Sequence, residues 1–261
     1  MIEIAENEKL TFPVKQSSKS RLAGKLRYWW SWFVAGSLLL VVATPSLIVL
    51  GIINKRMWLF PLASWGAKTW LRACGATVKV TGQENLDPDR TYVFASNHRS
   101  YLDTATLFFC AGRKMGLVAK KELLAVPVFG QGMGFINIIA IDRSNAERAL
   151  RSMEKARAVM ADGYSFGLFV EGTRGMPGEL LPFKKGAFHL ALQTNSPIIP
   201  VAIKNTDWMM GKRTGVAYAG EIEMVLLPPI VTAGRGADDV MTLLLETRAA
   251  IVEELKTKSE K

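Results

Sequence analysis

An uncharged stretch of 25 residues, Trp29 to Ile53, constrains the fold of this chain more than any other feature. As a continuous α-helix it would be about 37 Å long, which exceeds the roughly 30 Å hydrocarbon core of a bilayer. Trp29, Trp30 and Trp32 stand at its start, where tryptophan is typical of a membrane interface. The segment is too long and too late for the apolar part of a signal peptide, so we expect it to be retained and to contact a membrane.

Basic residues flank this apolar segment on both sides, and they leave three arrangements open. The positive-inside rule draws both flanks to the cytoplasmic side, and Pro45 can turn or kink a helix. A hairpin of two short helices that enter and leave the same face of the membrane satisfies both facts, and we expect this arrangement. The alternatives are one full transmembrane span and a buried core helix of a soluble protein.

A second apolar and aromatic stretch, Met57 to Gly75, predicts a helix at the membrane interface. Its Lys68 and Arg72 are four residues apart and share one helical face. Residues 1–20 are polar, and we expect a flexible leader. These features divide the chain into residues 1–75, a basic leader with a membrane-embedded helical hairpin or span, and residues 76–261, a second domain.

The excess positive charge of the chain lies in its N-terminal part. Residues 1–75 carry ten Lys/Arg against three acidic residues, a net charge of +7, whereas the remainder carries 23 against 20, a net charge of +3. Because these basic residues flank an apolar run, anionic phospholipid fits them better than nucleic acid does. We therefore expect a lipid partner and no nucleic acid.

The two cysteines, Cys74 and Cys110, have neither a CxxC spacing nor a cluster of histidines. This pattern predicts two buried, reduced thiols and no metal site. It is typical of a domain in a reducing, cytoplasm-facing compartment.

From about Val78 onward, strand-like and helix-like segments alternate along the chain. Strands are predicted over residues 91–97, 114–120, 136–143, 165–172 and 197–205, with further strand-like runs within 215–227. Helices are predicted over residues 101–112, within 121–135, and over 146–160, 184–195 and 238–256. The alternation predicts an α/β domain with a mixed, largely parallel sheet and helices on both faces.

The segment "NHRSYLD", Asn97 to Asp103, follows the first of these strands and holds one of the two histidines of the chain. Ser100 and Asp103 have the spacing of an N-terminal helix cap. His98 in a turn and Asp103 in the first helical turn could also meet, and a histidine oriented by a carboxylate makes a general base near neutral pH. The segment alone leaves both interpretations open, and one carboxylate can serve both. The other histidine, His189, lies within a predicted helix and is interpreted as structural.

A second polar segment, "FVEGTRG" (Phe169 to Gly175), follows the strand predicted over residues 165–172. Gly172 and Gly175 would let backbone N–H groups approach an anion, and Arg174 could bind a phosphate through two hydrogen bonds. A surface turn with a salt bridge is the alternative interpretation. Glu171 would fit beside an anion only if it orients Arg174 or a substrate hydroxyl.

Together these segments resemble the glycerolipid acyltransferase family that includes the 1-acyl-glycerol-3-phosphate acyltransferases. The first family block, NHxxxxD, is matched at Asn97, His98 and Asp103, and the second ends in Ile141, Asp142 and Arg143. The third appears as "FVEGTRG", with Val170 in place of proline and Gly175 in place of serine. The fourth, an apolar strand with proline, appears as "SPIIPVAI" from Ser196 to Ile203. The second block lacks the usual preceding glycine and phenylalanine, and the whole resemblance covers about residues 75–205.

The resemblance implies a role for each matched residue. His98 would deprotonate the sn-2 hydroxyl of 1-acyl-glycerol-3-phosphate, and Asp103 would orient and stabilise the histidine. The hydroxyl would attack a fatty acyl thioester on coenzyme A or acyl carrier protein, and the product would be phosphatidic acid. The residues that would bind the acceptor are Asn97, Arg143, Glu171, Gly172, Thr173 and Arg174.

The resemblance implies no metal or prosthetic group, because the acyl-CoA or acyl carrier protein is a co-substrate. Residues 76–261 would be the catalytic domain, facing the cytoplasm from an inner (plasma) membrane. Three other functions remain open: an acyltransferase for glycerol 3-phosphate, another lysophospholipid or a lyso-aminolipid; a non-catalytic lipid-binding protein; and a thioesterase or other hydrolase.

Overall fold

Two adjacent strands at the centre of the sheet are buried over their whole length. The computed structural model describes residues 8–15, 17, 20–55, 58–112, 114–142 and 146–257. Every residue of β3 (Val93–Ser96) and of β8 (Ile198–Lys204) is buried, as expected of strands that are covered on both faces. Phe94 packs into the core on one face of the sheet, whereas its neighbours Val93 and Ala95 pack into the core on the other.

The sheet has seven strands in the order β2-β9-β8-β3-β6-β4-β5. The remaining strands are β2 (Ala76–Thr81), β4 (Met115–Lys120), β5 (Ile138–Ile141), β6 (Ser165–Phe169) and β9 (Gly220–Leu226). Adjacent strands are parallel except for β8 and β9. The predicted mixed, largely parallel sheet is thus confirmed. The carboxyl ends of β3, β6 and β8 meet at one edge, and the segments that follow β3 and β6 there are "NHRSYLD" and "EGTRG".

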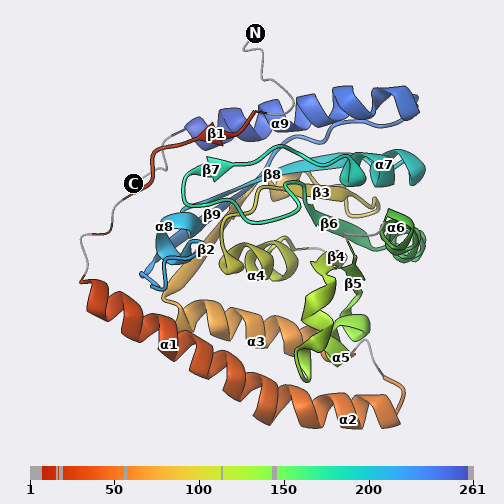
Figure 1. The fold of residues 1–261 in the computed structure, drawn as a ribbon. Helices are drawn as coiled ribbons and strands as arrows, with labels where there is room; N and C mark the ends of the chain where they lie inside the picture. The colour runs from red at the N-terminus through yellow and green to blue at the C-terminus, as the bar shows by residue number, and fades with distance from the viewer. Residues whose placement is uncertain are drawn as a thin grey trace.

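Helices cover both faces of the sheet, as predicted (Figure 1). One layer consists of α3 (Leu59–Ala73), α4 (Tyr101–Cys110), α5 (Phe129–Met133) and α8 (Thr206–Met210). The opposite layer consists of α6 (Ala146–Ala161), α7 (Gly186–Gln193) and α9 (Val240–Lys256). The predicted strands and helices occur where they were expected, but strand β2 and helix α8 were not predicted, and only β9 forms within residues 215–227.

The apolar N-terminal segment is one continuous helix, not the two short helices expected within it. It consists of α1 (Arg21–Ser37), a π-helical turn (Leu38–Ala43) and α2 (Thr44–Ile52). Proline lacks an N–H group and its ring crowds the preceding turn, and the wider π-helical turn ahead of Pro45 accommodates both effects. The Thr44 and Ser46 hydroxyls donate to the carbonyls of Leu39 and Val42 at 3.0 and 2.7 Å, which ties the backbone together on both sides of the proline.

Among the described residues, this segment is the one helix that is long and apolar enough to cross a membrane, and its most apolar window has no buried residue. The chain reverses after Ile52, and α3 then runs back between α1 and α4 (Figure 1). Trp32 and Trp70 meet across these two helices, with ring centroids 5.9 Å apart. Large apolar side chains point outward along the long helix: Trp29, Trp30, Phe33, Leu40, Val41, Ile48 and Ile52. Such an exposed apolar helix is suited to membrane association.

The described part of the N-terminal leader is attached to the domain, contrary to the flexible leader that was expected. Strand β1 (Leu10–Thr11) pairs antiparallel with β7 (Glu179–Leu180), and the Phe12 N–H donates to the Gly178 carbonyl at 2.7 Å. The Lys9 ammonium also lies 2.8 Å from the Glu179 carboxylate. Backbone pairing of this kind leaves no trace in composition, which is why the polar sequence suggested a flexible segment.

Candidate active site

The loop that carries His98 is short and ends in a complete helix cap. Ser100 is the N-cap of α4; its hydroxyl accepts the Leu102 N–H at 3.1 Å, and the Asp103 carboxylate accepts the Ser100 N–H at 2.7 Å. This reciprocal arrangement satisfies two N–H groups that a helix start otherwise leaves without a partner. The helix start predicted from the sequence is therefore confirmed.

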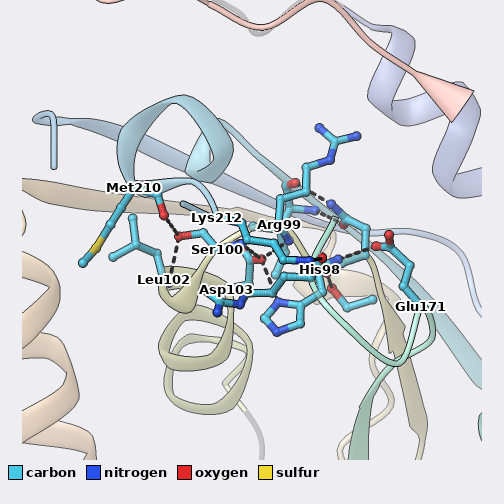
Figure 2. Close-up of polar contacts among 12 residues, drawn as sticks. His98, Arg99, Ser100, Leu102, Asp103, Glu171, Met210 and Lys212 are labelled. Carbon is cyan, nitrogen blue, oxygen red and sulfur yellow. Dashed lines mark hydrogen bonds and ion pairs between the residues drawn. The ribbon is translucent and has the colours of Figure 1, made fainter. Parts of the chain in front are cut away.

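The same carboxylate that caps the helix also faces the histidine (Figure 2). His98 Nδ1 lies 3.0 Å from Asp103 Oδ2, which also accepts the N–H groups of Arg99 at 2.6 Å and Ser100 at 2.7 Å. With Nδ1–H donating to the carboxylate, the neutral imidazole carries its lone pair on Nε2. Asp103 is completely buried, whereas the His98 side chain is 14% exposed. A fixed carboxylate thus orients a histidine that solvent can still reach, which is the arrangement a general base needs.

The His98 ring is held on its face as well as at its Nδ1 edge. It stacks on the Phe169 ring with centroids 3.9 Å apart and planes inclined by 16°. Phe169 ends strand β6 and pairs in register with Ser96, two residues before His98. The parallel pairing of β3 with β6 therefore sets the position of the imidazole.

Asn97 lies beneath the site, and the acceptor contact expected of it does not fit its position. Its side-chain amide donates to the Ile203 carbonyl at 2.9 Å and accepts the Ile203 N–H at 2.7 Å. The residue is completely buried. Asn97 therefore fastens the end of β3 to β8 and helps to position the loop that follows.

Glu171 is also a buried anchor and does not have the position of an acceptor contact. One of its oxygens accepts the His98 N–H at 2.6 Å, and the other accepts the Leu181 N–H at 2.7 Å. Burial raises the pKa of Glu171 to about 8, while these two hydrogen bonds and the charge of Arg99 act in the opposite direction. Its carboxyl group thus joins the "EGTRG" segment to the backbone of the histidine itself.

The N–H groups of the two glycines in "EGTRG" donate to backbone carbonyls. Gly172 has a φ of +71°, a conformation that suits glycine, and its N–H donates to the Phe169 carbonyl at 3.0 Å. The Gly175 N–H donates to the His98 carbonyl at 2.9 Å. Both N–H groups thus bind carbonyl groups of the chain, and their expected approach to an anion stays a prediction.

Arg174 and Thr173 occupy the outer part of this segment. The Arg174 guanidinium lies over the Tyr101 ring, 3.6 Å from its centroid, at the first residue of α4. Thr173 is exposed. Among the described residues predicted to bind the acceptor, Thr173 and Arg174 have side chains that solvent can reach, and Arg174 carries a positive charge.

The second predicted block ends outside the described part of the chain. Arg143 is not among the described residues, so its predicted contact with the acceptor stays a prediction. Its neighbour Asp142 is buried, and its carboxylate lies 2.9 Å from the Lys121 ammonium and 3.3 Å from the Arg148 guanidinium.

Sequence reasoning missed a buried ion pair behind the histidine loop. The Arg99 guanidinium lies 3.1 Å from the Asp207 carboxylate in α8, and its Nε donates to the Glu179 carbonyl at 2.9 Å. Phe12 of the leader covers the same guanidinium, 5.2 Å from its ring centroid. Arg99 therefore links the loop, α8 and the leader. No local signal in the sequence pointed to this pairing of distant residues.

The cysteines take no part in the site. Cys74 and Cys110 are both free thiols, and burial raises the pKa of Cys74 to about 12 and that of Cys110 in the same direction. In the part of the chain that the structure describes, no three His, Cys, Asp or Glu side chains gather in a metal-binding group. His189, interpreted as structural, lies in α7, where its side chain is exposed.

Comparison with known sequences adds a family to this geometry. A family model described as "Acyltransferase" matches residues 77–204. The chain is 32% identical to the 1-acyl-sn-glycerol-3-phosphate acyltransferase alpha of Mus musculus, over 90% of this chain and 81% of that protein. It is 36% identical to the 1-acyl-sn-glycerol-3-phosphate acyltransferase of Saccharomyces cerevisiae, over 70% of this chain and 61% of that protein. An uncharacterized acyltransferase of Schizosaccharomyces pombe is 38% identical over 66% of this chain, and the match spans 63% of that protein.

A solved structure has the same fold. The crystal structure of the 1-acyl-sn-glycerophosphate (LPA) acyltransferase PlsC from Thermotoga maritima superposes with a TM-score of 0.76 and a sequence identity of 24%. The match covers 92% of this chain and 99% of that one. It therefore includes the N-terminal helices as well as the sheet.

Proposed function

Because this chain belongs to the acyltransferase family, we propose that it transfers a fatty acyl group to the sn-2 hydroxyl of 1-acyl-glycerol-3-phosphate and makes phosphatidic acid. The observation that carries the proposal is the 3.0 Å contact between His98 Nδ1 and Asp103 Oδ2, in a loop whose histidine stays accessible. The names of the mouse and budding-yeast relatives support this acceptor. The acyl donor is a thioester of coenzyme A or of acyl carrier protein.

In the proposed reaction, the substrate brings its own nucleophile. His98 Nε2 takes the proton of the lysolipid hydroxyl as its oxygen attacks the thioester carbonyl and the new C–O bond forms. Asp103 stabilises the imidazolium, which then returns the proton to the sulfur as the C–S bond breaks and the thiol leaves. Base catalysis of this kind contributes about 10²- to 10⁴-fold to a rate. No serine or cysteine nucleophile is required, in keeping with the high pKa of the buried Cys74 thiol.

The proposed reaction also explains the exposed apolar surface of the N-terminal helices. The acceptor and the product are lipids, so a domain that lies against the membrane reaches both. The long helix packs along α3, and its π-helical turn also contacts α5. A helix held along the side of the domain fits a position in the plane of the membrane interface better than a full span. We propose that it lies on the cytoplasmic face of an inner membrane, with its outward aromatic and aliphatic side chains in the lipid.

Thiol release by purified protein tests the reaction. With acyl-CoA and 1-acyl-glycerol-3-phosphate, wild-type protein is expected to release free thiol and to form phosphatidic acid. Thiol release that does not need the acceptor would indicate a thioesterase. No release with any acceptor or with either donor would indicate a non-catalytic lipid-binding protein. An acceptor series of glycerol 3-phosphate, other lysophospholipids and a lyso-aminolipid then identifies the preferred acceptor.

The position of the long helix has its own test. Cysteine labelling at positions before Tyr28 and after Asn54 in intact cells is expected to find both positions on the cytoplasmic side. Labelling of the two positions from opposite sides of the membrane would instead establish a full span.

A further inference from the structure

Three cationic side chains border one pocket beside the His98 loop, and two of them belong to no sequence motif discussed above. The pocket has a volume of about 350 Å³ and is lined by Arg174, Lys212 and Arg213 together with Tyr28 and Tyr101. None of the described residues that line it is acidic. The Lys9 ammonium and, more weakly, the Lys212 charge lower the pKa of the Glu179 carboxyl, which is not part of the pocket lining. Three cations around one pocket create a positive local potential, which suits an anionic ligand.

Side-chain and backbone contacts hold two of the three cations of this pocket, Arg174 and Lys212, in place, whereas Arg213 is exposed. The Arg174 guanidinium stacks 3.6 Å from the centroid of the Tyr101 ring, and the Lys212 ammonium donates to the Arg174 carbonyl at 2.5 Å. The Lys212 N–H also donates to the Arg99 carbonyl at 3.3 Å. Lys212 is therefore bound to both segments of the site, the "EGTRG" segment and the His98 loop, as its position beside that loop also shows (Figure 2).

The segment that carries Lys212 and Arg213 is fixed to the helix cap next to His98. The Ser100 hydroxyl donates to the Met210 carbonyl at 2.7 Å, and Ser100 pairs with Gly211 in an isolated bridge. On its other side the pocket reaches Tyr28, which belongs to α1 of the apolar helix. The pocket thus lies between the catalytic loop and the helix that we propose to contact lipid.

The geometry points to Lys212 and Arg213 as residues that recognise a terminal phosphate on the acceptor lipid, together with Arg174. The inference rests on the proposed function and specifies which acceptors that site prefers. A phosphate monoester carries about 1.5 to 2 negative charges at pH 7, whereas a phosphodiester headgroup contributes a single one. Several cations around one pocket therefore favour a lysolipid whose phosphate is unsubstituted over lysolipids with a larger headgroup or none.

Coenzyme A also carries a phosphate monoester, so the donor is a second possible source of the same chemistry. We assign the pocket to the acceptor because Tyr28, in the membrane-contacting helix, forms part of its wall. A soluble donor has no need to enter between that helix and the catalytic loop.

The double variant Lys212→Gln, Arg213→Gln tests the assignment. Glutamine removes both charges but retains an amide N–H that can donate to the Arg174 carbonyl. Loss of charge-assisted hydrogen bonds is expected to raise the KM for 1-acyl-glycerol-3-phosphate by about 10- to 100-fold. The KM for acyl-CoA and the rate with monoacylglycerol, an acceptor without phosphate, are expected to stay within a few-fold.

A charge-matched control is available on the opposite helical layer. Lys155 and Arg157 are exposed in α6, and Lys155→Gln, Arg157→Gln is expected to leave every KM unchanged. Lys212→Arg, Arg213→Lys is expected to restore the low KM for the phosphorylated acceptor. Midpoints of thermal unfolding establish that all variants are folded.

Three results separate this inference from the proposed function. If wild-type protein acylates 1-acyl-glycerol-3-phosphate and the double variant does so with an unchanged KM, the inference is wrong and the function stands. If the double variant raises the KM for acyl-CoA alone, the pocket holds the phosphate of the donor and the assignment is overturned. If wild-type protein does not acylate this lipid, the midpoint of thermal unfolding tests the pocket by itself. A midpoint that rises with glycerol 3-phosphate but not with glycerol, and that does not rise in the double variant, supports a pocket for a phosphate monoester. A wild-type midpoint that does not rise with glycerol 3-phosphate rejects the inference.

Discussion

The two sides of the site are built in opposite ways. His98 and Asp103 are five residues apart. The Asp103 carboxylate contacts His98 and also accepts the Ser100 N–H at the start of α4, so both contacts form within one short segment. The cationic side is assembled from distant segments: Lys212 meets Arg174 across 38 residues, and Tyr28 comes from the N-terminal helix. The His98–Asp103 pair depends on local geometry, whereas the positive charge around the pocket depends on the whole fold. The predictions below test whether this division holds.

The largest effect is expected from His98→Ala. Removal of the proposed base should lower kcat by about 10²- to 10⁴-fold, because a positioned general base contributes about this much to a rate. Thiol release with acyl-CoA and 1-acyl-glycerol-3-phosphate measures it. The unfolding midpoint of the variant, measured beside that of wild type, establishes that the loss of activity is not a loss of the fold. Equal activity in wild type and variant would show that His98 is not the base.

Glu171 lies far from His98 in the sequence but binds the backbone of the His98 loop. We expect its substitution to change the stability of the protein. The pKa of Glu171 is raised to about 8 in the folded chain from an ordinary value near 4.5, so the folded state holds this proton more tightly than the unfolded state does. The free energy of unfolding should therefore fall as pH rises from about 4.5 to about 8, by up to about 1.4 kcal/mol per pH unit from this group.

Unfolding by denaturant across this pH range, for wild type and Glu171→Gln, measures the contribution. At pH 5 the variant should be less stable than wild type, because one amide N–H of the glutamine then faces a backbone N–H. The free energy of unfolding of the variant should not fall between pH 4.5 and pH 8 as that of wild type does. A wild-type stability that rises over the same range, relative to the variant, would contradict the raised pKa.

Asp103→Asn separates orientation of the histidine from capping of the helix. The neutral amide cannot stabilise the imidazolium, so kcat should fall by about 10²-fold, with about 1 kcal/mol of stability lost from the weaker cap. Ser100→Ala is the matched variant, because it removes the cap hydroxyl, together with its hydrogen bond to the Met210 carbonyl, but keeps the Asp103 contact with His98. It should lose similar stability while kcat stays within a few-fold. A Ser100 variant as inactive as the Asp103 variant would mean that helix geometry alone explains the loss.

Arg174→Gln tests the acceptor side with a smaller expected effect. Loss of the guanidinium should raise the KM for 1-acyl-glycerol-3-phosphate by about 10-fold, since one charge-assisted hydrogen bond contributes about 1.5 kcal/mol or more. The rate with monoacylglycerol should be unaffected, as should the KM for acyl-CoA. An equal loss with both acceptors would assign Arg174 to the structure of the loop.

The smallest effect is expected from the leader. Phe12→Ala removes the ring over Arg99 and should cost about 1 kcal/mol of unfolding free energy, with a change in kcat below about 10-fold. Lys9→Ala, which removes an ion pair whose lysine is half-exposed, should change the unfolding free energy by less than about 1 kcal/mol. Thermal or denaturant unfolding distinguishes the two. If neither substitution changes stability, the attachment of β1 to β7 does not stabilise the Arg99–Asp207 pair.

The long apolar helix shows where sequence reasoning about one segment succeeds and where it fails. The absence of charge from Trp29 to Ile53 predicted a segment that seeks an apolar environment, and its outward side chains agree. The chain reversal was expected near Pro45, but it occurs after Ile52, so that α3 is the returning helix. A proline inside a helix has two outcomes, a break or a widened turn, and local sequence does not distinguish them.

The sequence by itself determined the alternation of strands and helices, the helix start at Ser100, and the meeting of His98 with Asp103. These features depend on hydrophobic period, turn chemistry and distances of a few residues, all of which act within one segment. The positions of Asn97 and Glu171 could not be predicted from the sequence in the same way. Both are polar residues beside a catalytic motif, and only their partners, Ile203 and Leu181, identify them as buried anchors.

Only the tertiary structure decided which distant groups surround the histidine. The Arg99–Asp207 ion pair, the attached leader and the pocket with Lys212 and Arg213 each join segments far apart in the chain. Such pairings follow from the order of strands in the sheet and from the packing of α8 and α1 beside α4. A buried ion pair is formed only when the fold removes both charges from water together, and no local pattern in the sequence records which two residues those are.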